Sequence, residues 1–140
     1  MTELLELRGV VEAAPDAVAD VLLDVRPGGR SPLAQGGAIE EEDGDEFVLS
    51  LSGSRITVTV DRSARTVVQQ GEWWYRGVTS VHPDPRGAQV VHQIFNVAAG
   101  HGWAVQWVSR GPLRAAPTTF AAQIAALGDE LHCAAWVLDD

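Results

Sequence analysis

Between residues 47 and 98, short strand-like segments alternate with turn residues, and this pattern limits the possible folds more than any other feature of the chain. The segments are 47–51, 56–60, 66–70, 74–82 and 88–98. Strands joined by such short connections can pair only with antiparallel neighbours. Gly71 and Gly77 interrupt the strand patterns at places where a sheet can bend. With a further strand predicted over residues 3–13, we expect a curved antiparallel sheet of about six to seven strands.

The C-terminal part of the chain carries an apolar stripe with helical spacing. Its members are Phe120, Ile124, Leu127, Leu131 and Leu138, with Ala134 filling the gap. The steps between them place all of these side chains on one helical face. We therefore predict a long helix over residues 117–137, preceded by a break at Gly111-Pro112. Together with the sheet, this helix predicts an α+β fold.

A shorter helix is predicted near the N-terminus. Pro15 suits a first helical turn, and apolar residues follow it at helical spacing until Pro27 and two glycines end the pattern. Residues 26–38 are expected to form a loop, and the acidic run 40–46 is expected to be a solvated turn. A cation site in that run is the alternative interpretation.

The composition of the chain limits which binding partners and which cellular compartment we expect for the protein. The chain has 140 residues without an internal repeat or linker, which suits one domain over residues 1–140. The net charge is −9, and all ten basic residues are arginine, so nucleic acid and anionic membrane surfaces are not expected as partners. Cys133 is the single cysteine, the first residues do not resemble a signal peptide, and no run of about 18 apolar residues occurs. We expect a cytoplasmic protein with no membrane span.

Three segments carry a resemblance to a known superfamily. They are Val10 to Val18, where a strand runs into a helix opened by Ala-Pro, the turn Pro83-Asp84-Pro85-Arg86-Gly87 between two strands, and Phe120 to Leu131. Their order resembles the helix-grip fold of the START-like superfamily, which includes polyketide cyclases and dehydrases and lipid-transport domains. The resemblance implies a cavity between helix and sheet that holds an apolar or aromatic small molecule. It does not choose between carriers and enzymes.

No motif proposes a metal or another cofactor. Histidines occur at positions 82, 92, 101 and 132, and none has the spacing of a metal-binding motif. We therefore expect no metal site and no cofactor.

The predicted hairpin around the 83–87 turn supplies the polar candidates. If that turn sets the register, Tyr75 and His92 share a face, with Gly77 opposite His92, whereas Trp74 and Arg76 share the other face. On an apolar surface His92 suits a general base or a ligand anchor, or else a histidine satisfied by a neighbour. Arg76 suits either a ligand contact or pairing with another strand residue.

The tryptophans are concentrated at two places, Trp73-Trp74 and Trp103/Trp107. Indole rings suit the wall of a pocket for flat molecules, and core packing is the alternative. The candidate ligand-binding residues are Trp74, Tyr75, Arg76, His92, Trp103 and Trp107. No catalytic residue is proposed.

Three functions remain open at this stage. The first is a binding or carrier protein for an apolar or aromatic molecule, held in a cavity that opens near loops 26–38 and 99–116. The second is an aromatase/cyclase- or dehydratase-type enzyme acting on a polyketide-like substrate. The third is a module that binds another protein through its sheet, and a homodimer is also left open.

Overall fold

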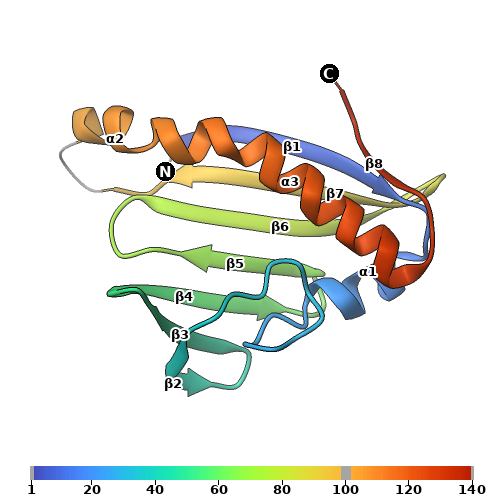
Figure 1. The fold of residues 1–140 in the computed structure, drawn as a ribbon, viewed down its shortest axis with the longest axis horizontal. Coiled ribbons are helices and arrows are strands. Elements are labelled where there is room, and N and C mark those ends of the chain that lie inside the picture. The colour runs from blue at the N-terminus through green and yellow to red at the C-terminus, as the bar shows by residue number, and fades with distance from the viewer. Residues whose placement is uncertain (1, 99–101, 140) are drawn as a thin grey trace.

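A computed structural model describes residues 2–98 and 102–139, and shows one large curved sheet with its helices gathered on one face (Figure 1). The eight strands are β1 (Thr2–Val11), β2 (Ala38–Asp43), β3 (Glu46–Leu51), β4 (Ser54–Asp61), β5 (Thr66–Gln70), β6 (Tyr75–Asp84), β7 (Gly87–Asn96) and β8 (Ala135–Val137). The helices are α1 (Pro15–Leu22), α2 (Gly102–Val108) and α3 (Arg110–Leu131). The strand order is β2-β3-β4-β5-β6-β7-β1-β8. The predicted α+β fold with a long C-terminal helix is confirmed.

One edge strand of the sheet was not predicted from the sequence. The acidic run forms β2 and a tight turn at Gly44, whose φ is +60°, rather than a solvated turn alone. All six residues of β2 are exposed, so this edge strand has no apolar alternation that could reveal it. Its backbone pairs with β3, and Arg55 of β4 bonds Glu40 at 2.8 Å.

The long helix begins and ends earlier than predicted. It starts at Arg110, because Pro112 lies in its first turn, where a missing N–H removes no intrahelical hydrogen bond. It ends at Leu131, and His132 adopts the left-handed conformation with φ 54° and ψ 47°. Leu138 is therefore not part of the helical stripe. The chain turns back as β8, which pairs with the free edge of β1.

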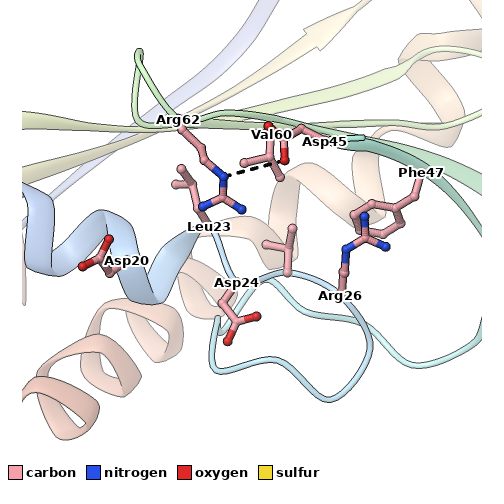
Figure 2. Close-up of a pocket in the computed structure, with 9 residues that line it drawn as sticks. Asp20, Leu23, Asp24, Arg26, Asp45, Phe47, Val60 and Arg62 are labelled. Atoms are coloured by element: carbon pink, nitrogen blue, oxygen red, sulfur yellow. Dashed lines mark ion pairs between the residues drawn. The ribbon is translucent and has the colours of Figure 1, made fainter. Parts of the chain in front are cut away.

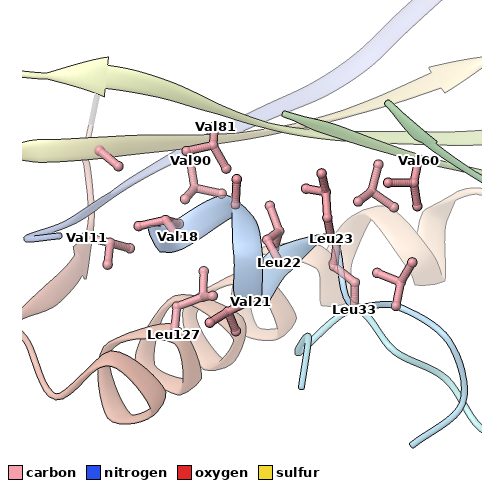
Figure 3. Close-up of a cluster of buried hydrophobic side chains, with 14 of the residues drawn as sticks. Val11, Val18, Val21, Leu22, Leu23, Leu33, Val60, Val81, Val90 and Leu127 are labelled. Atoms are coloured by element: carbon pink, nitrogen blue, oxygen red, sulfur yellow. The ribbon is translucent and has the colours of Figure 1, made fainter. Parts of the chain in front are cut away.

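The core lies between α1, α3 and the covered face of the sheet (Figure 3). Val18, Val21 and Leu22 of α1 are almost fully buried because helical spacing places them on one side. Figure 3 shows them between the sheet and Leu127 of α3. Leu131, which the stripe also predicted to be buried, is only half-buried at the end of the helix. Burial of this face holds the C-terminal half of α3 close to the sheet.

The β6–β7 hairpin has a different register from the predicted one. The ladder continues through Asp84 and Gly87, so the loop has two residues and Thr79, not Gly77, faces His92. The difference is two residues, and side chains alternate with a period of two, so His92 and Tyr75 share a face as predicted. The structure places that face under α3, which the sequence left open.

Among the described residues, no helix combines the length and the apolar character that crossing a membrane requires.

Candidate functional site

A pocket of about 400 Å³ lies between the sheet and the N-terminal half of α3. Its lining comes from the loop residues Pro32, Leu33, Ala34 and Gln35, from Gln69, Tyr75, His92 and Ile94 of the sheet, and from Pro112, Ala115, Ala116, Thr119, Phe120 and Gln123 of α3. The loop between α1 and β2 forms one rim, and α3 forms the other. Volumes of this size are ordinary for small-molecule sites. The pocket lies in the region where the sequence predicted a cavity.

His92 forms part of the sheet side of this pocket. The imidazole is 8% exposed and lies parallel to the ring of Phe120, with a centroid distance of 6.1 Å. Its Nδ1 is 2.7 Å from Oγ1 of Thr79, the residue directly across the ladder. Burial lowers the pKa of His92 to about 4, because a charged imidazole is poorly solvated there. The ring is therefore neutral near pH 7.

Tyr75 lies at the start of β6, and its ring extends along the strand over Gly77. A Cβ atom added to Gly77 would be 2.6 Å from the tyrosine oxygen, so the absence of a side chain at Gly77 allows this conformation. Trp74 supports Tyr75 from behind in an edge-to-face contact, with ring centroids 5.5 Å apart. Burial raises the pKa of Tyr75, so its hydroxyl is also uncharged near pH 7.

Gln69 connects the sheet to the loop at the rim. Its side chain is 7% exposed, and its Nε2 donates a hydrogen bond of 3.3 Å to the carbonyl of Leu33. Arg30 anchors the same loop from outside through an ion pair of 2.8 Å with Glu130 of α3. Gln69 thus joins the loop to the sheet at the pocket rim, whereas Arg30 joins the loop to the C-terminal end of α3, outside the pocket.

A second hollow, of about 250 Å³, lies between the end of α1 and the β3–β4 hairpin (Figure 2), and both of its arginines already pair with acidic residues. Arg62 forms an ion pair with Asp45. The guanidinium of Arg26 bonds Glu42 and lies 4.9 Å from the centroid of the Phe47 ring. Because the arginines are engaged in this way, we do not assign a ligand to this hollow.

The candidate residues do not all meet at the first pocket. Tyr75 and His92 line it, whereas Arg76 points to the opposite face of the sheet and bonds Gln70 at 2.8 Å. Trp74 precedes β6 and packs against Ile94 on the covered face, which corrects the predicted face. Trp74 is 9% exposed and is not among the residues that line this pocket.

The two tryptophans of α2 lie differently. Trp107 is 63% exposed, with the guanidinium of Arg110 4.4 Å from its ring centroid, and it does not line the pocket. The side chain of Trp103 lies outside the described residues.

Several lining residues were not predicted from the sequence. Gln69 lies in a predicted strand, two residues after Val67, and alternation along a strand places both side chains on the same, buried face. The sequence does not show which face of β5 is buried, because that depends on how the strand pairs with its neighbours. Thr119 and Gln123 are polar residues beside the stripe of α3, and nothing in their spacing indicates a pocket. Among the described residues, no three histidine, cysteine, aspartate or glutamate side chains gather as a metal site would require.

Comparison with solved structures bears on the fold. A protein from Thermobifida fusca, solved by NMR in solution, matches 89% of this chain and 91% of its own, at 20% identity and a TM-score of 0.53. The chain has the helix-grip fold. At this identity the similarity does not extend to activity.

Two other structures align over most of their length with lower scores. TTHA0849 from Thermus thermophilus matches 88% of this chain and 91% of its own, at 13% identity and a TM-score of 0.45. Ara h 8.0201 matches 90% of this chain and 96% of its own, at 13% identity and a TM-score of 0.43. No protein-family model and no curated protein matches the sequence.

Proposed function

We propose that this helix-grip chain is a START-like protein that binds or carries an apolar or aromatic small molecule between α3 and the sheet. The observation that carries this proposal is the pocket of about 400 Å³, whose walls are mostly aliphatic and aromatic carbon around a few polar groups. Such a composition is typical of small-molecule sites.

A pair of neighbouring threonines on α3 offers a direct test. Thr119 lines the pocket and Thr118 does not, although both are exposed and adjacent on the same helix. Neighbours on a helix point about 100° apart, so Thr119→Trp fills the pocket, whereas Thr118→Trp places the same ring outside it. Matched urea and thermal melts would show that both variants are folded.

Native mass spectrometry of the purified protein then reads out occupancy. We expect a non-covalent small-molecule adduct on the wild type and on Thr118→Trp, and its loss from Thr119→Trp. A broad panel of lipids, sterols and polyketide-like aromatics should raise the melting temperature of the same two proteins. If no adduct occurs and no panel member changes the melting temperature, the proposed function is wrong.

An enzyme of the aromatase/cyclase or dehydratase kind is the second candidate, because His92 and Tyr75 both line the pocket. Such an enzyme could use the N–H of the neutral imidazole to polarise a carbonyl group of a bound substrate through a hydrogen bond. His92→Phe separates the two candidates by turnover of the bound polyketide-like compound: a carrier turns it over neither as wild type nor as the variant, whereas an enzyme turns it over as wild type and loses that activity in the variant.

A module that binds another protein through the sheet is less well supported. That function predicts an exposed apolar patch and no cavity, and the pocket beneath α3 is contrary to the second of these.

A further inference from the structure

The residues that line the pocket have a common electrostatic property. Although charged residues make up 21% of the sequence, none of the described residues that line this pocket is an aspartate, glutamate or arginine. Its polar groups are three glutamine amides, two hydroxyls and one imidazole. An ionised ligand would lose its hydration here without meeting an opposite charge, which is strongly unfavourable.

His92 offers one defined hydrogen-bonding group to the pocket. The buried hydroxyl of Thr79 has His92 Nδ1 as its single side-chain partner among the described residues, so both groups are satisfied when Thr79 donates and Nδ1 accepts. The proton of the neutral imidazole then lies on Nε2. Within the described residues no protein group bonds Nε2, and no buried side-chain nitrogen or oxygen lacks a partner, so Nε2 must be accessible. His92 therefore presents an N–H donor to the pocket.

Gln69 offers the complementary group. The carbonyl of Leu33 can only accept a hydrogen bond, which fixes the Gln69 NH₂ group toward the loop and leaves Oε1 as the free acceptor. No donor among the described residues bonds Oε1. Because every buried side-chain nitrogen or oxygen among these residues has a partner, an Oε1 atom without one must be accessible. The hydroxyl of Tyr75 lies over Gly77, which is the ladder partner of Gln69.

The donor and the acceptor are well separated. Gln69 belongs to β5 and His92 to β7, with β6 between them, and the ladders place Gln69 level with Ile94, two residues from His92, so their backbones lie about 12 Å apart. A single hydroxyl group does not suit both positions, because each hydrogen bond spans only about 3 Å. Two polar groups at opposite ends of one ring system fit this separation.

We propose, on the basis of the proposed function, that the pocket selects an uncharged molecule with a hydrogen-bond acceptor for Nε2 of His92 and, at its other end, a hydroxyl-type donor for Oε1 of Gln69. Neutral hydroxylated ring compounds with a carbonyl group belong to this class. Carboxylates and phosphates of the same size do not, because nothing in the pocket balances their charge.

Three two-ring probes test this class with the wild-type protein. Methyl 6-hydroxy-2-naphthoate has both the acceptor and the donor, methyl 2-naphthoate lacks the donor, and 6-hydroxy-2-naphthoate is anionic. By calorimetry near pH 7, we expect loss of the hydroxyl to weaken binding about 3- to 10-fold. We expect the carboxylate to bind at least about 100-fold more weakly than the hydroxy ester, as a charge buried without a partner should.

Protein variants assign these preferences to the two residues. Thr79→Val combined with His92→Phe removes the donor without leaving the threonine hydroxyl unpaired, and should weaken binding of the hydroxy ester about 3- to 10-fold. Gln69→Met should abolish the preference for the hydroxy ester over methyl 2-naphthoate. His82→Phe is the control, since His82 is exposed, bonds Ser80 and lies outside the pocket.

The outcomes separate this proposal from the proposed function. The ligand class is overturned if the carboxylate binds as tightly as the ester, if the variants keep the wild-type preferences, or if none of the three probes binds. The proposed function is overturned only if the adduct that depends on Thr119 is absent as well. The expected result is tight binding of the hydroxy ester by the wild type and by His82→Phe, weaker binding by the Thr79→Val/His92→Phe variant, and no preference between the two esters in Gln69→Met.

Discussion

Thr79 and His92 face each other across the β6–β7 ladder, with Oγ1 of the threonine 2.7 Å from Nδ1 of the imidazole. This contact fixes the orientation of a neutral imidazole beside the pocket. Because both side chains are buried, loss of the contact should lower the stability of the protein as well as change the orientation of the imidazole.

A double-mutant cycle measures this contact. Thr79→Val and His92→Phe should each destabilise the protein by about 1–3 kcal/mol, since each leaves a buried polar partner unpaired. The double variant should cost less than the two single costs together, by at least about 0.5 kcal/mol. Urea unfolding of the four proteins gives the coupling directly. Simple additivity would show that the two groups do not interact in solution.

The lowered pKa of His92 predicts a pH-dependent stability. The unfolded chain takes up a proton at His92 below its ordinary pKa of 6.5, whereas the folded protein does so only near 4. The stabilisation is complete above pH 6.5 and is lost as the pH falls toward 4, by up to about 3 kcal/mol. Urea melts of the wild type and of the Thr79→Val/His92→Phe variant isolate this effect, because their other titrating groups are shared. Parallel pH curves for the two proteins would contradict it.

The packing of α3 predicts unequal effects of two leucines. Leu127→Ala should cost about 2–5 kcal/mol, because its side chain is 1% exposed within the main core. Leu131→Ala should cost less, since Leu131 lies half-buried at the end of the helix. Denaturant unfolding tests both. A cost below about 0.5 kcal/mol for Leu127→Ala would mean that the helix does not pack as described.

Gly77 should control the position of Tyr75. The Cβ of Gly77→Ala would be 2.6 Å from the tyrosine oxygen, so the ring must move, and we expect a cost of about 1–3 kcal/mol. Binding of methyl 6-hydroxy-2-naphthoate should weaken as well. Gly111→Ala is the control, because a Cβ there meets no atom within 4 Å. Equal melting curves and affinities for the two variants would show that the Tyr75 ring is not held over Gly77.

The acidic composition predicts weak interaction with polyanions. With a net charge of −9, the protein should not bind duplex or single-stranded nucleic acid at physiological salt. Fluorescence polarisation with labelled oligonucleotides tests this prediction. A micromolar affinity that falls steeply with added salt would contradict it.

The sequence alone determined the antiparallel sheet, the placement of His92 and Tyr75 on one face of the β6–β7 hairpin and the main apolar stripe of α3. These features depend on local periodicity, because alternation along a strand and helical spacing set which side chains can share a face. For the same reason a two-residue change of register left His92 and Tyr75 on one shared face.

Only the tertiary structure decided the remaining features, because they depend on contacts between distant segments. β2 and β8 lack a periodic signal and are defined by the strand edges they pair with. The orientation of Gln69 depends on the Leu33 carbonyl, 36 residues earlier in the chain. The pocket itself exists because α3 packs against the sheet through Phe120, Ile124 and Leu127, whereas smaller side chains such as Ala115 and Ala116 line its N-terminal half. The spacing of apolar residues along the chain does not show where a helix will leave empty space against a sheet.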